Sequence, residues 1–348
     1  MRDARAGPYR AAQRGLKPYS AAITTGDALM NPIKKAIAAM AAACACASPA
    51  LAADAPPITM IVPFSAGGST DILARLLAKD MGDILDTTVI VENKPGAEGF
   101  IASRQLKTAK PDGNTVMLVT TSVYAINPAI FTEIPYDSRK DFATVSVVAS
   151  SPNVILAASN SKYATLNDVL DAARATPEQV YYGTGATMHL LNSKLLEALS
   201  GTRMTSVPYK GSAAAYPDLI ANRIDFMVDQ PLSSMSFIQG GQLKALAVTS
   251  AQRWPQMPDV PTVAELGYPD FATTSWWAVV APAGTPAATL QKLHDAIGQG
   301  LARPATQEKI RQIGADISNM SLDEAQAYTA RELDSWKAIA DTAKVKLN

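Results

Sequence analysis

The feature that most constrains the fold of this 348-residue chain is a regular alternation of two apolar patterns. Short β-rich runs, such as residues 58–64 and 89–92, are separated by segments whose apolar residues recur at helical spacing, such as 71–85 and 166–175. This alternation is typical of βαβ units, in which helices cover mostly parallel sheets. The pattern therefore predicts an α/β fold with mostly parallel sheets flanked by helices.

Two long apolar stretches indicate where the chain crosses between lobes. Residues 145–158 and 276–282 each have the length and composition of an extended segment that joins two sheets. A chain of this size usually divides into two domains. We expect residues 53–152 and 278–348 to form lobe 1 and residues 153–277 to form lobe 2. The prediction is a two-lobed architecture with two crossover strands and a cleft between the lobes.

The first 52 residues have the pattern of an export sequence. After Met30 come two lysines, an alanine-rich apolar block at residues 37–47, and small residues up to Ala52. This order is typical of a signal peptide, so we expect one at residues 30–52 with cleavage after Ala52. Residues 1–29 are rich in Arg and Ala and lack hydrophobic periodicity. We interpret them as a non-native or disordered extension.

Cysteine content and charge narrow the possible partners. Both cysteines, Cys44 and Cys46, lie in the predicted signal peptide, and the residues before them lack the leucine that a lipid anchor requires. No run of about 18 strongly apolar residues occurs, so we expect no membrane insertion after cleavage. Seven of the 31 basic and two of the 31 acidic residues precede position 53, which leaves a net charge of about −5. Such a surface repels nucleic acid, which we do not expect as a partner.

A glycine-containing turn follows the first predicted strand. Two glycines allow a guest to approach the backbone closely, and the next helix begins with free N–H groups at Ser69 or Thr70. The turn can hold an anion through backbone donors and the helix dipole. The alternative is a tight strand-to-helix turn, which an isolated glycine pair favours. The predicted ligand-binding residues are Phe64, Ser65, Ala66, Gly67, Gly68, Ser69, Thr70 and Asp71.

A second turn of the same kind, in lobe 2, strengthens the binding hypothesis. It also links a short strand to a helix, and neither turn matches a dinucleotide-binding or P-loop fingerprint. Ligands bind at the carboxyl ends of parallel strands, so we expect the two turns to face each other across the cleft. The predicted ligand-binding residues here are Gly183, Thr184, Gly185, Ala186 and Thr187.

Three further polar residues follow predicted strands. Thr121 and Ser122 can add hydroxyls on the lobe 1 side, although helix capping is an equally good interpretation. Asp229 can bind a ligand amino group or an ordered water, although an Asp after a strand is often a turn residue. We include all three among the predicted ligand-binding residues.

Residues that enzymes use for catalysis are scarce in the predicted mature chain. It contains two histidines, His189 and His294, and no cysteine, which excludes a thiol nucleophile and a cysteine-rich metal site. His189 lies just after the second turn, where it could touch a ligand or help to cap its helix. No Gly-x-Ser-x-Gly or His-Glu-x-x-His motif occurs. We expect a protein that is not an enzyme, with no cofactor and no metal site.

Six sequence blocks occur together in a characteristic order. They are residues 62–71 (VPFSAGGSTD), 91–97 (VENKPGA), 208–211 (PYKG), 245–249 (ALAVT), 258–262 (PDVPT) with Glu265, and 281–286 (APAGTP). Through these blocks, residues 57–348 resemble the Bug family of periplasmic solute-binding proteins, the capture component of tripartite tricarboxylate transporters. Six blocks in matching order are far more specific than any one of them.

The resemblance implies a type II periplasmic-binding-protein fold that closes on its ligand. It implies that ligand carboxylates are held by the first turn and by residues 183–187, partly through water. The expected ligand is a dicarboxylate, tricarboxylate, amino acid or aromatic acid, captured in the periplasm and delivered by transient contact to membrane permease subunits. A periplasmic sensor module that reports a carboxylate to a membrane signalling protein needs the same cleft and is the alternative. An exported hydrolase or isomerase is disfavoured by the missing catalytic motifs.

Overall fold

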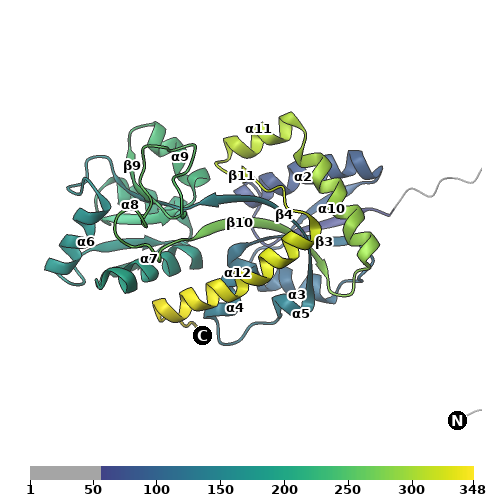
Figure 1. The fold of residues 1–348 in the computed structure, drawn as a ribbon, viewed down its shortest axis with the longest axis horizontal. Coiled ribbons are helices and arrows are strands. Elements are labelled where there is room, and N and C mark those ends of the chain that lie inside the picture. The colour runs from purple at the N-terminus through teal and green to yellow at the C-terminus, as the bar shows by residue number, and fades with distance from the viewer. Residues whose placement is uncertain (1–55) are drawn as a thin grey trace, which may run out of the picture. The chain divides into compact units, whose positions relative to one another are not determined.

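The computed structural model describes residues 56–348, which belong to a single unit (Figure 1). The predicted signal peptide at residues 30–52 and the extension at residues 1–29 lie outside the described residues. Two separate sheets are present, one of six strands and one of five. We refer to the six-stranded sheet with its helices as the first lobe and to the five-stranded sheet with its helices as the second lobe.

Each sheet gathers strands that are distant in the sequence. The six-stranded sheet has the order β11-β4-β10-β3-β1-β2, and the five-stranded sheet has the order β7-β6-β8-β5-β9. The strands of the first sheet are β1 (Ile58–Val62), β2 (Val89–Asn93), β3 (Thr115–Thr120), β4 (Phe142–Pro152), β10 (Thr274–Pro282) and β11 (Asp316–Ile317). Those of the second are β5 (Val154–Ala158), β6 (Tyr181–Thr184), β7 (Thr205–Pro208), β8 (Phe226–Asp229) and β9 (Leu243–Val248).

The sheets are mixed, which corrects the expectation that they are mostly parallel. Strand β1 pairs in parallel with β2 and β3, and β6 pairs in parallel with β7 and β8. The remaining pairings, which involve β4, β5 and β10, are antiparallel. The reason is that β4 leaves the first sheet for the other lobe and β10 returns from it, so the two strands run in opposite directions. A parallel pair would need a crossover connection, usually a helix, that carries the chain back to the same end of the sheet. The parallel strands still place their carboxyl ends together in each lobe.

Two crossover strands connect the lobes, as Figure 1 shows. Strand β4 continues into β5 with a single residue, Asn153, between them, and β10 returns the chain to the first sheet beside β4. Asn153 is buried, and its backbone N–H donates to Thr249 Oγ1 at 2.9 Å. Its side-chain oxygen accepts a hydrogen bond from Ser275 of β10 at 3.1 Å. These contacts tie the two crossovers to each other where the sheets meet.

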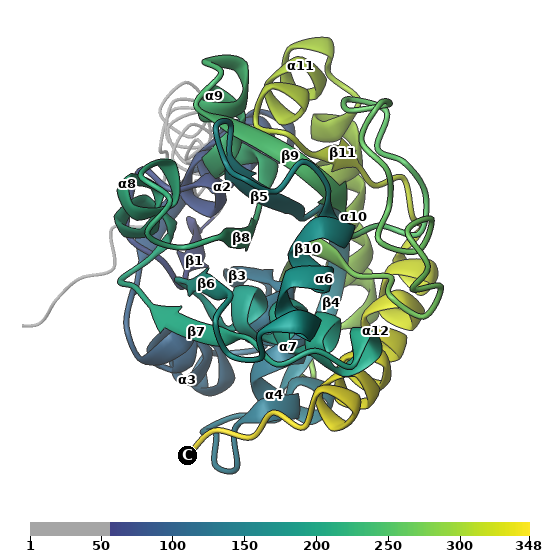
Figure 2. The same cartoon turned by 90° about the vertical axis from the view of Figure 1, so that its left-hand side faces the viewer.

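Helices cover both sheets and extend the contact between lobes. The long C-terminal helix α12 lies against β4, η2 and α4 of the first lobe and also against α7 of the second (Figures 1 and 2). The helical segments are α2 (Ser69–Leu85), η1 (Ala97–Gly99), α3 (Phe100–Thr108), η2 (Ser122–Ile126), α4 (Asn127–Ile130), α5 (Ser138–Asp141), α6 (Leu166–Ala175), α7 (Thr187–Ser200), α8 (Ser212–Ile220), α9 (Pro231–Gln239), α10 (Ala287–Leu301), α11 (Pro304–Gln312) and α12 (Leu322–Ala343).

Buried apolar side chains hold these layers together. One cluster runs through both lobes and includes Val123 of η2, Met188 and Leu191 of α7, and Trp336 of α12. A second cluster lies between the first sheet and the helices α2 and α10. Because α2 begins at the first glycine turn, its packing in this second cluster fixes the position of that turn.

The two faces of α2 make the packing testable. Leu77 is fully buried in the second cluster, whereas Ile72 on the same helix is 43% exposed. We expect Leu77→Ala to lower the free energy of unfolding by about 2–5 kcal/mol, because it removes buried methyl groups and leaves a cavity. The matched control Ile72→Ala should change it by less than about 0.5 kcal/mol. Urea unfolding curves measure both, and equal losses would contradict this account of α2.

Candidate functional site

The first glycine turn links β1 to α2 and leaves its backbone accessible. Ser65, Ala66, Gly67 and Gly68 are exposed. Gly67 has a φ of +88°, a conformation that favours glycine. Gly68 is the N-cap of α2 and no side chain caps this helix. The amides of the first helical turn are therefore open to a guest, because they have no partner within the helix.

Asp71 is a structural anchor of this turn. It is 3% exposed, and its Oδ2 accepts the N–H of Gly67 at 2.9 Å. Asn93, at the end of β2, donates to Asp71 Oδ1 at 2.9 Å, and Arg75 forms an ion pair with the same carboxylate at 2.9 Å. Burial alone would raise the pKa of Asp71, but the hydrogen bonds from Arg75, Gly67 and Asn93 outweigh it and hold the pKa below its ordinary value. The carboxylate thus stays charged and faces the protein.

The second glycine turn links β6 to α7 and is held by a buried imidazole. The N–H of Gly185 donates to His189 Nδ1 at 3.2 Å. His189 is 4% exposed, and its Nε2 lies 3.1 Å from Asp229 Oδ1 at the end of β8. Because Nδ1 accepts, the ring proton is assigned to Nε2, where it is donated to Asp229. Ala186, the N-cap of α7, is exposed, and no side chain caps this helix either.

Asp229 is fully engaged within the second lobe. Besides His189, it accepts hydrogen bonds from the Tyr216 hydroxyl and from the N–H of Gln230. Burial opposes ionisation of this carboxyl, but the hydrogen bonds from His189 and Tyr216 help to keep the pKa of Asp229 below its ordinary value. Burial and the Asp229 carboxylate raise the pKa of Tyr216, so its hydroxyl remains a donor.

Close packing fixes the path of the second turn. A Cβ at Gly185 would lie 2.5 Å from the carbonyl carbon of Gly211 and 2.8 Å from the N of Ser212, at the start of α8. The Tyr209 N–H donates to Thr184 O at 2.7 Å. The turn therefore needs glycine at position 185 because another backbone segment occupies the space of a side chain.

Loops from both lobes converge near η2. A Cβ at Gly99 would meet the side chains of Val123 at 2.7 Å and of Pro63 at 3.3 Å, so the loops after β1, β2 and β3 lie together. Helix α7, which starts at the second turn, contacts η2, which follows β3. Helix α7 of the second lobe thus lies against the segment that follows β3 of the first lobe.

The predicted ligand-binding residues divide into two groups by burial. Those at least partly accessible are Phe64, Ser65, Ala66, Gly67, Gly68, Ser69, Ser122, Gly185 and Ala186. Those that are buried are Thr70, Asp71, Thr121, Gly183, Thr184, Thr187 and Asp229.

Most of the buried group has partners inside the protein. Thr70 Oγ1 accepts from Trp277 Nε1 at 3.1 Å, and Thr121 Oγ1 accepts the Trp276 N–H at 2.7 Å. By contrast, the hydroxyls of Thr187 and Thr120 are buried and have no hydrogen-bond partner among residues 56–348. Thr187 begins α7 and Thr120 ends β3, so the two orphaned hydroxyls come from opposite lobes.

Sequence reasoning missed several residues that shape the site. Asn93 and Tyr216 were not singled out, although each bonds a carboxylate that holds or flanks a glycine turn. Asn93 lies within one of the six blocks, which was its available signal. Tyr216 lies within an apolar helix pattern, and the sequence around it carries no signal of a role in the site. For His189 the sequence offers two roles, ligand contact and helix capping, and the structure shows its ring bonded to the turn before its helix.

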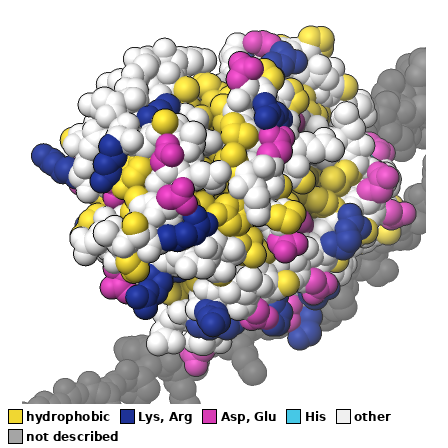
Figure 3. Space-filling view, turned by 60° about the vertical axis from the view of Figure 1, so that its left-hand side comes forward, with side chains coloured by type: hydrophobic (Ala, Val, Ile, Leu, Met, Phe, Trp, Pro, Cys, Tyr) yellow, Lys and Arg dark blue, Asp and Glu magenta, His cyan; other side chains and the backbone are white. Residues whose placement is uncertain are grey.

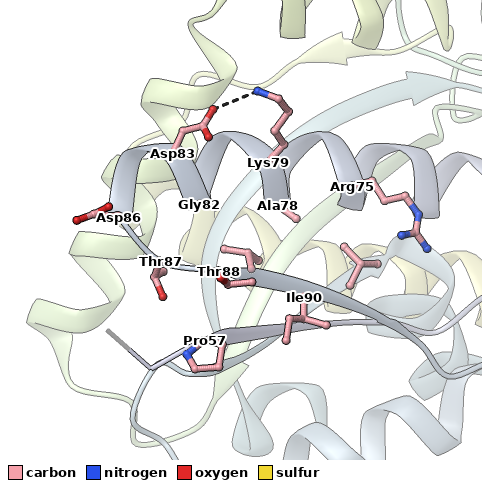
Figure 4. Close-up of a pocket in the computed structure, with 12 residues that line it drawn as sticks. Pro57, Arg75, Ala78, Lys79, Gly82, Asp83, Asp86, Thr87, Thr88 and Ile90 are labelled. Atoms are coloured by element: carbon pink, nitrogen blue, oxygen red, sulfur yellow. Dashed lines mark hydrogen bonds and ion pairs between the residues drawn. The ribbon is translucent and has the colours of Figure 1, made fainter. Parts of the chain in front are cut away.

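A large hollow of about 1080 Å³ lies elsewhere, between α2 and the edge strand β2 (Figure 4). It runs along β2 from the residues before that strand to Val91 and along α2 from Arg75 to Asp86, so it lies on the outer edge of the sheet and none of the predicted ligand-binding residues lines it. Ligands of open α/β sheets bind at the carboxyl ends. The charged pair Lys79 and Asp83 beside it is joined by an ion pair of 3.2 Å. This hollow therefore lacks the features of the glycine turns.

The surface carries mixed charge. On the face that Figure 3 shows, Lys and Arg side chains are interspersed with Asp and Glu. Within residues 56–348, no helix combines the length and the apolar character that spanning a bilayer requires.

Comparisons with known proteins agree on one family. The family model described as "Tripartite tricarboxylate transporter family receptor" matches residues 73–345. Protein BugT of Bordetella pertussis is 33% identical over 295 residues, which cover 84% of this chain and 90% of BugT. Among solved structures, R. palustris Rpa4515 with adipate is 32% identical with a TM-score of 0.76, covering 83% of this chain and 98% of that chain. MatC (Rpa3494) from Rhodopseudomonas palustris with bound malate is 26% identical with a TM-score of 0.73, covering 81% and 98%.

The second turn offers a matched pair of substitutions. We expect Gly185→Ala to lower the free energy of unfolding by about 1–3 kcal/mol, because its Cβ meets backbone atoms that must move. Gly183→Ala, two residues earlier, meets the flexible end of Ile224 at 2.7 Å and should cost less than about 1.5 kcal/mol. Urea unfolding of the two variants side by side measures the difference, and a greater loss for Gly183→Ala would refute the packing argument.

Proposed function

This chain belongs to the tripartite tricarboxylate transporter receptor family, to which the Bug proteins are related, and on that premise we propose that it captures a small carboxylate between its lobes. In this proposal the two glycine turns face each other across a cleft, and each receives one end of the ligand. Closure of the lobes then presents the loaded protein to membrane permease subunits by transient contact. The predicted signal peptide at residues 30–52 supports a periplasmic location.

The observation that carries the proposal is that α2 and α7 both begin at a glycine turn without a side-chain cap. Capping boxes occur at Thr165 of α6 and at Ser321 of α12, whereas α3, α8, α9, α10 and α11 lack a side-chain cap, as α2 and α7 do. The uncapped starts leave amide donors and the positive ends of two helix dipoles for an anion. The buried Thr187 hydroxyl, without a partner among residues 56–348, supplies a further donor at the start of α7.

Backbone donors are sufficient for useful affinity. A hydrogen bond to a charged group contributes about 1.5–3 kcal/mol. Two or three such bonds from each lobe reach micromolar binding, about −8 kcal/mol, after the cost of association. The two ligand-bound relatives were solved with adipate and with malate, which makes dicarboxylates the first candidates for this chain.

The engaged acids support carboxylate recognition over recognition of an amino group. Asp71 and Asp229 are 3% and 2% exposed, and both carboxylates accept several hydrogen bonds from the protein. Pairing either of them with a ligand ammonium would require breaking those bonds. In our proposal, both acids shape the turns and do not touch the ligand.

The proposal describes binding without chemical change. The family and the structural relatives are solute-binding proteins and not enzymes. His189, the histidine next to the second turn, is committed to Gly185 and Asp229 by hydrogen bonds. We therefore propose that the ligand leaves the protein unaltered.

Gly68→Val tests the proposal directly. Gly68 has φ −80° and ψ 172°, which suit valine, and its Cβ would contact only Ser65 O at 3.8 Å. We expect a stable fold and a loss of dicarboxylate affinity of at least about 100-fold, because the side chain fills the space where the ligand approaches the amides. Thermal-shift titrations with adipate and malate measure this.

Gly298→Val is the matched control. Gly298 is an exposed glycine of α10 with no heavy atom within 4 Å of its Cβ position, so valine there leaves both turns untouched. It should keep the thermal shift of the wild type. A full ligand-induced shift in Gly68→Val would sink the proposed site. A wild-type protein that binds no member of a panel of dicarboxylates, tricarboxylates, amino acids and aromatic acids would sink the proposed function.

A further inference from the structure

We infer that His189 and Asp229 are positioning residues that set the second glycine turn for its ligand, and that protonation of the imidazole releases the turn. Binding in the second lobe would then weaken in mild acid while the first turn keeps its shape. The inference rests on the proposed function for its effect on affinity. The hydrogen-bond arrangement that carries it is independent of any ligand.

The two turns are built on the same plan. In each, a glycine N–H donates to the side chain four residues later, in the first turn of the helix: Gly67 to Asp71 at 2.9 Å and Gly185 to His189 at 3.2 Å. In each turn, the side chain that accepts the glycine N–H forms a second hydrogen bond with the last residue of a parallel strand in the same sheet. Asn93 of β2 holds Asp71 at 2.9 Å, and Asp229 of β8 holds His189 at 3.1 Å.

The two turns differ in the side chain that accepts the glycine N–H, which is a carboxylate in the first turn and an imidazole in the second. A neutral imidazole accepts at Nδ1 and donates from Nε2, which matches Gly185 on one side and Asp229 on the other. When Nδ1 gains a proton, it can no longer accept the Gly185 N–H, and two donors face each other. The bond from Nε2 to Asp229 survives and becomes an ion pair. Protonation therefore breaks the contact to the turn and keeps the contact to the strand.

Among residues 56–348, one charged side chain lies in direct contact with the imidazole. Asp229 of β8 is that neighbour, and Tyr216 of α8 bonds its other oxygen. Other titratable groups on α7 and on the elements packed against it have separate partners. Lys194 and Tyr182 contact Glu197, Tyr124 of η2 packs against Trp276, and Glu332 of α12 accepts from Trp276 and Trp336.

The first turn serves as an internal reference. Hydrogen bonds keep the pKa of Asp71 below its ordinary value, so this carboxylate gains a proton only at lower pH than a free aspartate. A proton added to the imidazole of His189 therefore acts on the acceptor of Gly185 and leaves the acceptor of Gly67 unchanged.

Two substitutions of His189 separate positioning from mere packing. His189→Asn places an amide oxygen near the Nδ1 position, which can still accept the Gly185 N–H and does not titrate. His189→Leu keeps a comparable volume and removes the acceptor at every pH. Circular dichroism first establishes that each variant is folded. If His189→Leu fails to fold, the comparison of wild type with His189→Asn decides alone.

The affinity arm uses calorimetric titration of adipate and of malate at about pH 7.5 and pH 5.5. We expect wild-type affinity to fall about tenfold more than that of His189→Asn on acidification, the order of one lost hydrogen bond. Protonation of the ligand itself affects both proteins equally and cancels. His189→Leu should bind weakly at both pH values. Equal pH responses of wild type and His189→Asn, with binding intact, overturn the inference and leave the proposed function standing.

The second arm needs no ligand. Amide hydrogen exchange, corrected for its intrinsic pH dependence, is followed at Gly185 and Gly67 in the free protein. We expect wild-type protection to fall at Gly185 in acid, with no change at Gly67, and we expect no fall at Gly185 in His189→Asn. If neither acid binds to the wild type, the proposed function suffers and exchange alone decides the inference. Unchanged Gly185 protection in wild type overturns it.

Discussion

The structure depends on the antiparallel pairing of β4 with β10, because these are the strands through which the chain leaves and re-enters the first sheet. Their register runs from Thr274 opposite Pro152 to Pro282 opposite Phe142, so the pairing spans the full length of β10. At its inner end Asn153 forms hydrogen bonds with both Ser275 and Thr249, and there β4 becomes β5 of the second sheet. Everything built at the carboxyl ends of strands in the two sheets inherits this alignment.

In the proposed site, the two glycine turns would hold an anion without a basic side chain in contact with it. Neither turn contains Lys or Arg, and the nearest arginine on α2, Arg75, is bound to Asp71. The acids behind the turns serve to orient amides, since a carboxylate that accepts a glycine N–H fixes the direction of the neighbouring donors. A site of this kind depends on geometry more than on net charge, which suits a family whose members bind different acids on one framework.

Local signals in the sequence were enough for much of the fold. Helix α6 spans Leu166–Ala175 as predicted, because its apolar spacing and the capping residue Thr165 both act within one segment. The two glycine turns were found for the same reason. The antiparallel direction of the crossovers was not, since strand direction is set by how distant segments dock. The hydrogen bonds that join Asp71 to Asn93 and Asp229 to Tyr216 were not predicted, because tertiary packing brings these distant segments together.

The second sheet has one further property: all its strands, β5 to β9, come from a single uninterrupted stretch of chain between β4 and β10. Its entry and exit strands are neighbours in the first sheet. One contiguous segment of the gene therefore encodes all the strands of the second sheet. Recombination at the two crossovers would exchange half of the binding surface between relatives in one event, while the surrounding framework keeps its own termini. Diversification of ligand choice within the family can then proceed by shuffling halves as well as by point substitution.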